Sequence, residues 1–446
     1  MDLSDMDLKD WKPSRFNMLT RTEEGTLLVF NSFSTAFMQF EGEEAEHFAH
    51  ILDGEPVEES PDFLETLARE GFIVPRTADE LERARKLHES LFEHDDRLRL
   101  TLLPTENCNF RCIYCYEEHT PKRMSPELIS SLVRLVRKKA PTLNNLGFSW
   151  FGGEPLLAMD IIEELTQQAL EICKEHHIEY SSGMVTNGYL LTDKMADRCF
   201  SAQISRFQIT LDGPAETHDT LRVLAGGGGT FDTIFANLQN LRRKKNDFQV
   251  KIRVNFTPDT ISRIPDFMQF LKAEFGGDSR FAIYFHPVGQ WGGKQDHLIK
   301  TCDRKTEFSL ETEFMTMALQ EGFTMDYWKD SLQIFGSACY AADPYSFAIG
   351  TDGTVYKCTV AFLDPTNQIG KITPDGSMNI DQELHNLWIR SGEETDTECQ
   401  LCAFRPVCQG NRCPLTRLQG NRKPCPKFYT QIDKCLPLLA AEARGA

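Results

Sequence analysis

Three closely spaced cysteines form a candidate metal-binding loop: Cys108, Cys112 and Cys115 in the segment CNFRCIYC. Thiolates at this CxxxCxxC spacing can bind three irons of a 4Fe-4S cubane, which leaves the fourth iron without a protein ligand. An open iron could chelate the amine and carboxylate of S-adenosylmethionine (SAM), whose one-electron cleavage gives a 5'-deoxyadenosyl radical that abstracts hydrogen. A zinc knuckle with one ligand from elsewhere is the alternative interpretation of this spacing.

The other cysteines fall into two further regions and a scattered set. The chain has 14 cysteines, and in a reducing compartment such dense thiols indicate metal or cluster ligands or catalytic groups rather than disulfides. Cys339 and Cys358 flank one region. The last region contains Cys399, Cys402, Cys408, Cys413, Cys425 and Cys435. We expect Cys173, Cys199 and Cys302, which stand apart, to be buried as small hydrophobic side chains.

The composition restricts the class of protein. A formal net charge of -18, with 48 Lys and Arg against 66 Asp and Glu, argues against a general nucleic-acid binder. No apolar run approaches the roughly 18 residues of a membrane span. The first residues are acidic and polar, unlike a secretory signal. These features predict a cytoplasmic protein with no nucleic-acid or membrane partner.

A regular alternation of strand-length apolar runs and helical segments begins near residue 98. Six runs are predicted strands: residues 98–103, 146–151, 180–186, 206–211, 250–256 and 280–287. Helical segments such as residues 125–139 separate them, which predicts an α/β domain with parallel strands. Six strands fit a partial barrel or an open doubly wound sheet, and both bind ligands at the C-terminal ends of strands. The cysteine loop follows the first of these strands.

The flanking regions have different patterns. Strands are predicted at residues 16–20, 26–31 and 35–40, and helices at residues 42–54 and within 61–74. This order in a short segment predicts a winged-helix-like module, followed by a charged connecting helix at residues 78–96. A cysteine-rich, turn-rich segment follows the alternating region. The predicted domains are therefore residues 1–95, 96–300 and 301–446.

The cysteine loop after the first of six βα strands resembles the radical SAM superfamily over roughly residues 98–290. The resemblance implies a partial (β/α)6 barrel with a SAM-binding 4Fe-4S cluster. WFGGEP, at residues 150–155, looks like the family's GGE motif. This likeness implies that Gly152 and Gly153 allow close backbone approach and that Glu154 meets the SAM amine.

Two later strand ends also resemble family motifs: VTNG at residues 185–188 and ITLDGPAETHDTLR at residues 209–222. In related peptide-modifying and sulfatase-maturating members, a hydroxyl residue before LDG contacts SAM and an arginine twelve positions on contacts its carboxylate. Those positions are Thr210, where Ser is more usual, and Arg222. Asn187, Arg253 and Asn255 are further candidates, with plain structural polar roles as the alternative.

The C-terminal segment resembles the SPASM extension, which carries auxiliary 4Fe-4S clusters. The resemblance implies one cluster on Cys339, Cys358 and Cys413. It implies another on Cys399, Cys402, Cys408 and Cys425, which makes three 4Fe-4S clusters in all. The segment CQGNRC departs from the pattern, because four residues separate Cys408 from Cys413 where three are usual. Cys435 could replace Cys425 as the last ligand. The three-cysteine set could leave an iron open for a substrate thiol, or Cys302 or Cys435 could complete it.

The N-terminal module resembles the recognition element of enzymes that modify ribosomally made peptides, in which a leader peptide adds as a strand to a small sheet. DNA binding and scaffolding are the alternatives. The combined resemblance implies a precursor peptide with a leader and a cysteine-containing core as substrate. It also implies an external one-electron reductant such as flavodoxin or ferredoxin.

The expected activity is therefore that of a radical SAM peptide maturase that forms thioether bonds, similar to the sactipeptide and ranthipeptide synthases. Carbon-carbon cross-linking and formylglycine formation are alternatives within the family. The sulfatase-maturating type usually has Asp directly after the cysteine at the position of Cys358, where this chain has Thr359. A non-catalytic metal protein that senses redox state is the alternative of another class.

Overall fold

The computed structural model describes residues 8–53, 61–93, 95–324, 326–391, 396–420 and 423–443. The chain forms two compact units, which we describe separately. The barrel unit comprises His94–Met325 and Asp343–Leu387. The terminal unit comprises Met1–Glu93, Asp326–Ala342 and Trp388–Ala446, so it contains both the N-terminal module and most of the late cysteines.

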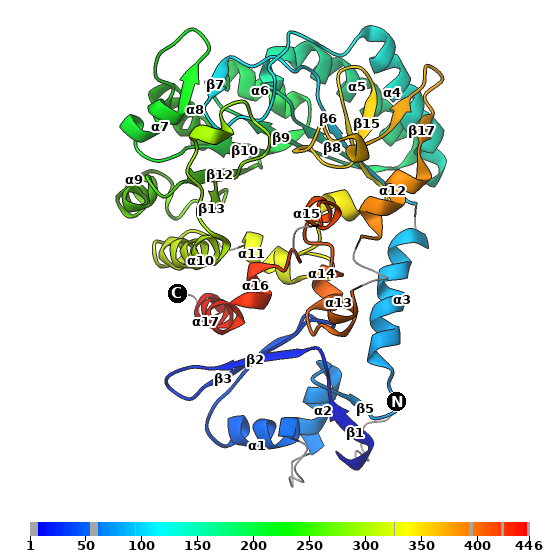
Figure 1. The fold of residues 1–446 in the computed structure, drawn as a ribbon, viewed down its shortest axis with the longest axis vertical. Coiled ribbons are helices and arrows are strands. Elements are labelled where there is room, and N and C mark those ends of the chain that lie inside the picture. Colours follow the sequence, from blue (N-terminus) through cyan, green and yellow to red (C-terminus); the bar gives the residue numbers. More distant parts are fainter. Residues whose placement is uncertain are drawn as a thin grey trace. The chain divides into compact units, whose positions relative to one another are not determined.

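A ten-stranded sheet forms the barrel unit, in the order β13-β12-β10-β9-β8-β6-β14-β15-β16-β17 (Figure 1). Its parallel strands include all six predicted from the sequence: β6 (Arg97–Leu102), β8 (Asn145–Trp150), β9 (Glu179–Thr186), β10 (Ile204–Thr210), β12 (Gln249–Phe256) and β13 (Phe281–Pro287). These six strands are neighbours in chain order and their order never reverses. The sheet is therefore wound in one direction, as in a barrel, and the doubly wound alternative is wrong.

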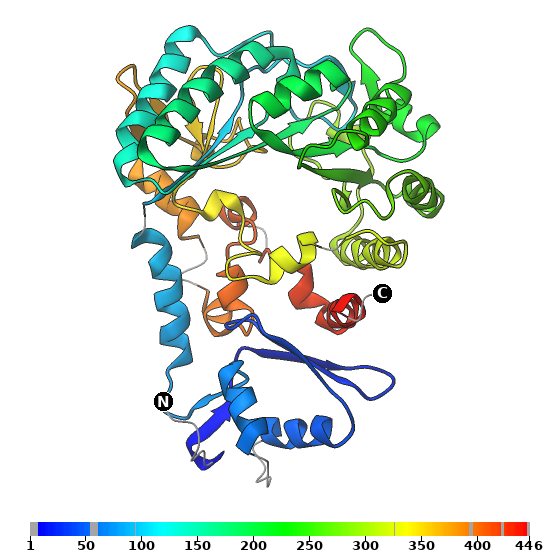
Figure 2. The ribbon, with the colours of Figure 1, turned by 180° about the vertical axis from the view of Figure 1, so that it is seen from behind.

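The helices that follow these strands cover the outer face of the sheet (Figure 2). They are α4 (Pro126–Lys139), α5 (Met159–His176), α6 (Asp193–Ser201), α7 (Ala215–Leu221), α8 (Phe231–Arg242) and α9 (Ile264–Phe275). Helix α4 illustrates why they form, because the Ser125 side chain caps it by accepting a hydrogen bond from the Leu128 amide, and Pro126 occupies its first turn. Its predicted bounds, residues 125–139, are correct to within one residue.

The region after residue 300 contains more regular structure than the sequence pattern predicts. In the barrel unit, β14 (Ser346–Ile349) pairs in parallel with β6, so it extends the sheet beyond the first predicted strand. Antiparallel strands continue from it: β15 (Thr354–Tyr356), β16 (Gln368–Ile372) and β17 (Met378–Ile380). Helix α10 (Arg304–Gln320) precedes them, and α12 (Gln382–Ile389) follows.

Two small sheets and several helices make up the terminal unit. Strands β2 (Asn17–Arg21), β3 (Leu27–Asn31) and β4 (Phe37–Phe40) form one antiparallel sheet, and β1 (Trp11–Pro13) pairs with β5 (Ile73–Pro75). The helices of the N-terminal module are α1 (Gly42–Asp53), α2 (Pro61–Arg69) and α3 (Glu80–Glu93). Apart from β1, which was not predicted, these elements match the predicted ones, although residue 54, the expected end of the first helix, lies outside the described residues.

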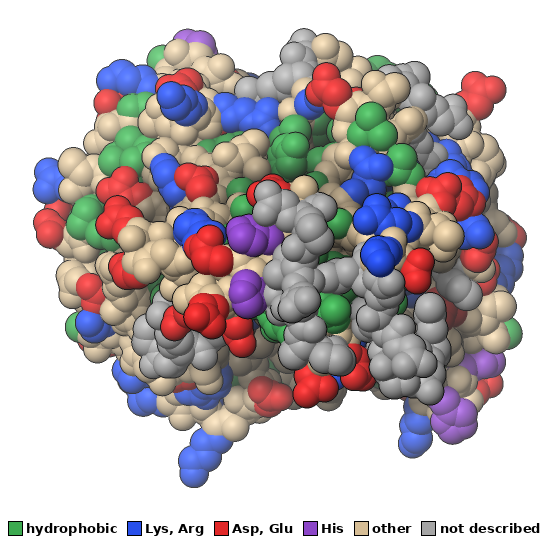
Figure 3. All heavy atoms as spheres, turned by 90° about the horizontal axis from the view of Figure 1, so that it is seen from below, with side chains coloured by type: hydrophobic (Ala, Val, Ile, Leu, Met, Phe, Trp, Pro, Cys, Tyr) green, Lys and Arg blue, Asp and Glu red, His purple; other side chains and the backbone are tan. Residues whose placement is uncertain are grey.

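The later segments of the terminal unit are helical. They are α11 (Asp326–Leu332), α13 (Thr397–Leu401), α14 (Arg405–Cys408), α15 (Pro414–Leu418), α16 (Lys427–Thr430) and α17 (Ile432–Ala443). Helix α17 packs against β2 and β3, which ties the C-terminal end of the chain to the N-terminal sheet. Within the described ranges, no helix has both the length and the apolar character needed to cross a membrane. On the face in Figure 3, the acidic and basic side chains that can be seen are interspersed, as is usual for a solvated surface.

Candidate active site and cysteine pocket

The predicted cysteine loop is held by a short two-stranded ladder inside the barrel unit. Strand β7 (Phe110–Cys112) pairs antiparallel with β11 (Arg222–Leu224), and this register sets Arg222 opposite Cys112. The Cys115 amide donates to the Cys112 carbonyl at 3.1 Å, and the Cys115 sulfur lies 3.3 Å from Nε2 of His119. The ladder therefore fixes the loop relative to β11, whose first residue is the predicted SAM-binding arginine.

Gly152 and Gly153 lie against the backbone that leads into the cysteine loop. A Cβ atom on Gly153 would come within 2.2 Å of the Asn107 carbonyl oxygen, and one on Gly152 within 2.5 Å of the Thr105 carbonyl oxygen. Gly152 also has φ +106°, a conformation that side chains other than glycine rarely adopt. The Glu154 amide donates to the Asn107 carbonyl at 2.8 Å. The glycines therefore let the second strand end pack directly on the segment that precedes Cys108.

The Glu154 carboxylate joins the ends of β8 and β9. It is fully buried and accepts hydrogen bonds from the Thr186 hydroxyl at 2.6 Å, the Asn187 amide at 2.8 Å and the Leu156 amide at 3.1 Å. Burial raises the pKa of Glu154, and these donors act against the rise. The Asn187 side chain donates to Asn109 Oδ1 at 2.8 Å, so it also supports the cysteine loop. Direct contact of Glu154 or Asn187 with SAM remains a prediction.

Arg222 belongs to a polar network beneath the cysteine loop. Its Nη1 donates to the Tyr114 hydroxyl at 2.8 Å, and Tyr114 in turn donates to Asp212. The Asp212 carboxylate also accepts from the Asn255 amide at 3.0 Å. Nε of Arg222 is buried and has no hydrogen-bond partner within the described chain. A buried, unsatisfied donor of a permanently charged group is a feature expected where an anionic ligand binds.

Two further candidates differ in their surroundings. Thr210 is buried at the end of β10, and its hydroxyl makes no hydrogen bond to any described residue. In contrast, Nε of Arg253 donates to Asn255 Oδ1 at 2.7 Å. Thr210 is therefore open to a ligand at the strand end, whereas Arg253 and Asn255 support each other.

Burial keeps the three thiols of the loop protonated unless a metal binds them. Burial raises the pKa of Cys108 and Cys112 and raises the pKa of Cys115 to about 12, so these thiols need a cation to release their protons near neutral pH. Nowhere in the described residues are three or more His, Cys, Asp or Glu side chains arranged to hold one metal ion. A cubane requires no such grouping, because each thiolate binds a different iron.

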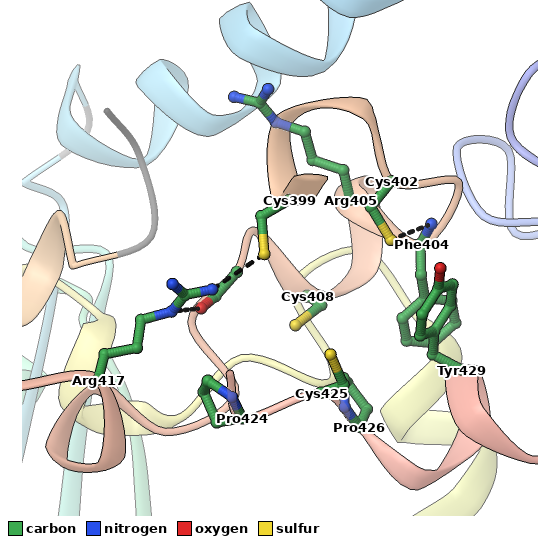
Figure 4. A pocket seen from close by; sticks show the side chains of 11 residues that line it. Cys399, Cys402, Phe404, Arg405, Cys408, Arg417, Pro424, Cys425, Pro426 and Tyr429 are labelled. Atoms are coloured by element: carbon green, nitrogen blue, oxygen red, sulfur yellow. Dashed lines mark hydrogen bonds between the residues drawn. The ribbon is translucent and has the colours of Figure 1, made fainter. Parts of the chain in front are cut away.

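A second cysteine site lies within the terminal unit. Cys399, Cys402, Cys408 and Cys425 line one pocket, and Figure 4 shows their sulfur atoms facing a common space. Burial raises the pKa of Cys408 to about 12 and also raises the pKa of Cys399 and of Cys402. These are the four residues predicted to hold one auxiliary cluster. Cys435, the alternative fourth ligand, is buried in α17 and is not among the residues that line this pocket.

The other predicted auxiliary set is divided between the two units. Cys339 and Cys413 belong to the terminal unit and Cys358 to the barrel unit. The Cys339 amide donates to the Asn411 carbonyl at 2.9 Å, and the Cys358 amide donates to Asn367 Oδ1 at 2.8 Å. Because the units are described separately, a shared cluster on these three cysteines remains a prediction.

The isolated cysteines follow the expected pattern in two of three cases. Cys173 and Cys199 are buried, as predicted. Cys302 is only partly buried, because it directly precedes Asp303, which caps the exposed start of α10. The prediction of a buried Cys302 was therefore wrong.

Comparison with known proteins identifies a Radical SAM domain within the chain. Residues 102–271 match the Radical SAM superfamily, a segment that contains the cysteine loop and every predicted SAM-binding residue. A cysteine-type anaerobic sulfatase-maturating enzyme of Clostridium novyi is 24% identical over 68% of this chain and 84% of its own length. An AdoMet-dependent heme synthase of Methanosarcina barkeri is 22% identical over 71% of this chain and 91% of its own length.

Solved structures share the fold. A structure of anSMEcpe with bound AdoMet and Cp18Cys peptide has a TM-score of 0.60 and 19% identity, and the match covers 78% of this chain and all of that one. Streptococcus suis SuiB bound to precursor peptide SuiA has a TM-score of 0.52 and 16% identity over 93% of this chain and 98% of its own. Residues 102–271 therefore form a Radical SAM domain, and the protein is a radical SAM enzyme, as predicted. The alternative of a non-catalytic redox sensor is wrong.

Sequence reasoning missed several residues that organise the site. Tyr114 lies between two of the cysteines and Asp212 lies within the LDG motif, so both belong to motifs that the sequence analysis recognised. Only the fold shows that they interact with Arg222. His218 was also missed, although its Nδ1 accepts from the Asp212 amide at 3.1 Å. No local sequence signal predicts these pairings, which join residues up to 108 positions apart.

Proposed function

We propose that this protein is a radical SAM peptide maturase that joins a cysteine sulfur to a carbon of an acceptor residue in a ribosomally made precursor peptide. The observation that carries the proposal is the presence of two different cysteine sites in one radical SAM enzyme. One is a three-cysteine loop at the strand end of the barrel, and the other is a separate pocket lined by four cysteines.

The residues of the barrel unit would hold the SAM-binding cluster and SAM. Cys108, Cys112 and Cys115 would bind three irons, and the bound cluster and SAM would supply a 5'-deoxyadenosyl radical. Arg222, with its unpartnered Nε, would hold the SAM carboxylate, and the Thr210 hydroxyl would contact SAM beside it. Glu154 would meet the SAM amine, and Gly152 and Gly153 would keep the loop close to it.

The thioether step balances without a further oxidant once an auxiliary cluster takes part. Hydrogen abstraction leaves a radical on the acceptor carbon, and the substrate sulfur bonds to that carbon as its thiol proton is released. The new carbon-sulfur bond leaves one surplus electron, which an auxiliary cluster held by this chain would accept. Four cysteines around one pocket suit a fully ligated cluster of this kind, and Cys339, Cys358 and Cys413 would hold the second. An external one-electron reductant, such as flavodoxin or ferredoxin, would begin each cycle.

The N-terminal sheet would bind the leader segment of the precursor. Strands β2 and β4 are its edges, and α17 packs against β2. Strand β4 pairs only with β3 among the described residues, so its outer edge could accept an added peptide strand through backbone hydrogen bonds. The structure of SuiB with its precursor peptide SuiA supports a peptide substrate for this fold.

A second candidate is maturation of a sulfatase by formylglycine formation. Relatives named as cysteine-type and serine-type sulfatase-maturating enzymes, each about a quarter identical to this chain, favour it. Thr359 after Cys358 disfavours it, since that family usually has Asp there. Carbon-carbon cross-linking is a third outcome that the same radical chemistry permits.

Peptides encoded beside the gene, incubated with the reconstituted enzyme, SAM and a reductant, distinguish these outcomes. A thioether product loses one hydrogen from carbon and one from sulfur, and its cysteine no longer reacts with iodoacetamide. A carbon-carbon product loses the same mass but keeps a reactive thiol, and a formylglycine product reacts with hydrazides. Deuterium on the acceptor carbon should appear in 5'-deoxyadenosine. Retention of every reactive thiol in the modified peptide would contradict the proposal, with the Cys108→Ala enzyme as the inactive control.

A further inference from the structure

Arg417 directs its guanidinium at a sulfur of the four-cysteine pocket. It lies in α15, and its Nη2 is 2.9 Å from the Cys399 sulfur (Figure 4). Its Nε donates to the Gly410 carbonyl at 2.5 Å, and its Nη1 donates to the Asp396 carboxylate at 3.1 Å. All three nitrogens of the group thus have a partner, one of which is a proposed cluster ligand.

Asp396 holds both members of this contact in place. Its carboxylate accepts the Cys399 amide at 3.2 Å as the cap of α13, and it pairs with Arg417 on its other oxygen. Lys423 also lies 3.0 Å from Asp396, so the carboxylate is shared between two cations. The side chains of Arg417 and Asp396 are only 12% and 11% exposed, so water screens their charges weakly.

The chemistry of the guanidinium decides what this contact can do. Arginine keeps its charge at any relevant pH, so the Cys399 sulfur always faces a positive donor. Reduction of a cluster adds one negative charge, which a hydrogen bond or a positive charge at a ligand sulfur stabilises. Hydrogen bonds to sulfur, net charge and solvent exposure are the main determinants of cluster potentials.

We propose that Arg417 is a positioning residue that raises the reduction potential of the cluster on Cys399, Cys402, Cys408 and Cys425, and so makes this cluster the better electron acceptor. The inference rests on the proposed function, because it needs a cluster in this pocket. It goes further, because it assigns the cluster in this pocket the role of electron acceptor. An electron left over from bond formation would be taken up here more readily than by a cluster without such a donor.

The test requires the potential of this one cluster. A full-length background variant removes the other two proposed clusters through Ala at Cys108, Cys112, Cys115, Cys339, Cys358 and Cys413. Anaerobic redox titration followed by electron paramagnetic resonance then reports on the remaining cluster. In this background we compare Arg417→Gln, which removes the charge, with Arg417→Lys, which keeps the charge but loses the planar fork. The matched control is Arg405→Gln, since Arg405 lines the same pocket but its guanidinium points away from the sulfurs (Figure 4).

The expected result is a shift to lower potential in Arg417→Gln, a smaller shift in Arg417→Lys and a potential near that of the background in Arg405→Gln, all with unchanged iron content. Equal potentials in the background and both Arg417 variants would overturn the inference. An equal shift in Arg405→Gln would also overturn it, because the effect would then be general charge and not the sulfur contact. Loss of iron from both Arg417 variants would overturn it as well, since Arg417 would then serve assembly. Absence of iron from the background itself would instead refute the cluster in this pocket, and with it the proposed function.

Discussion

The cysteine loop of the barrel unit and the cysteine pocket of the terminal unit hold thiols in different ways. The loop presents three cysteines, and backbone contacts hold it: the β7–β11 ladder and the close packing of Gly152 and Gly153. The pocket has four cysteines, which lie on α13, directly after α13, on α14 and before α16, and a charged side chain reaches one of their sulfurs. The loop is incomplete as a cubane site, whereas the pocket can satisfy every iron.

This difference separates two tasks. A site with one thiolate too few leaves an iron for a small ligand. The residues around the loop include Arg222, whose Nε has no partner among the described residues, and Thr210 at the end of β10. A complete site has no position for a ligand and suits electron transfer only. Under the proposed function, radical generation would belong to the barrel and electron uptake to the terminal unit.

Removal of either site's cysteines should produce the largest effect. Four iron per cubane predicts about twelve iron per reconstituted native chain and about eight after Ala replaces Cys108, Cys112 and Cys115. The same loss, to about eight, is expected when Ala replaces Cys399, Cys402, Cys408 and Cys425. Iron and sulfide analysis of anaerobically reconstituted protein measures both. An unchanged iron content in either variant would show that the mutated cysteines bind no cluster.

Gly153→Ala should damage the loop and spare the pocket. Its Cβ would meet the Asn107 carbonyl oxygen at 2.2 Å, so the backbone before Cys108 must move, at a cost of about 1–3 kcal/mol in the free energy of unfolding. Urea unfolding and the signal of the SAM-binding cluster report the effect. Gly147→Ala, on the strand β8 that leads to Gly153, is the control, because its Cβ would lie 3.5 Å from the nearest atom, Oγ of Ser181. Equal losses in the two variants would show that the close approach of Gly153 is unimportant.

Thr210→Val should have the smallest effect, limited to SAM binding. The hydroxyl makes no hydrogen bond to a described residue, so its loss should leave stability nearly unchanged. Loss of one hydrogen bond to SAM should weaken binding by about 1 kcal/mol, or roughly fivefold in Kd. Equilibrium dialysis of the reconstituted protein measures this change. Thr210→Ser keeps the hydroxyl and should bind SAM normally, and a similar weakening in both variants would contradict the assigned role.

The sequence predicted the elements of the fold that have a strong local signal. The six parallel strands were apolar runs of the right length, and the cysteines of both sites followed recognisable spacings. Strand β14 was missed because its four residues make a short run whose place beside β6 depends on a pairing across more than 240 positions. Strands β7 and β11 are three residues each, too short for any periodicity.

The sequence predicted which residues form the candidate site better than it predicted the contacts between them. Glu154, Arg222 and the glycine pair were found through motifs, but the contacts of the glycines with the cysteine loop depend on how two strand ends meet. Arg417 carried no signal, because it lies 18 positions after Cys399 and only the fold of the pocket brings them together. Charged side chains on short helices usually indicate a solvated face, so sequence reasoning passes over such a contact.

Reductive cleavage of SAM tests the central claim, radical generation at the three-cysteine loop, most directly. Reconstituted native protein should convert SAM to 5'-deoxyadenosine and methionine when a one-electron reductant is added. The variant with Ala at Cys108, Cys112 and Cys115 should form none, although its pocket cysteines are intact. Production of 5'-deoxyadenosine at the native rate by this variant would contradict the account.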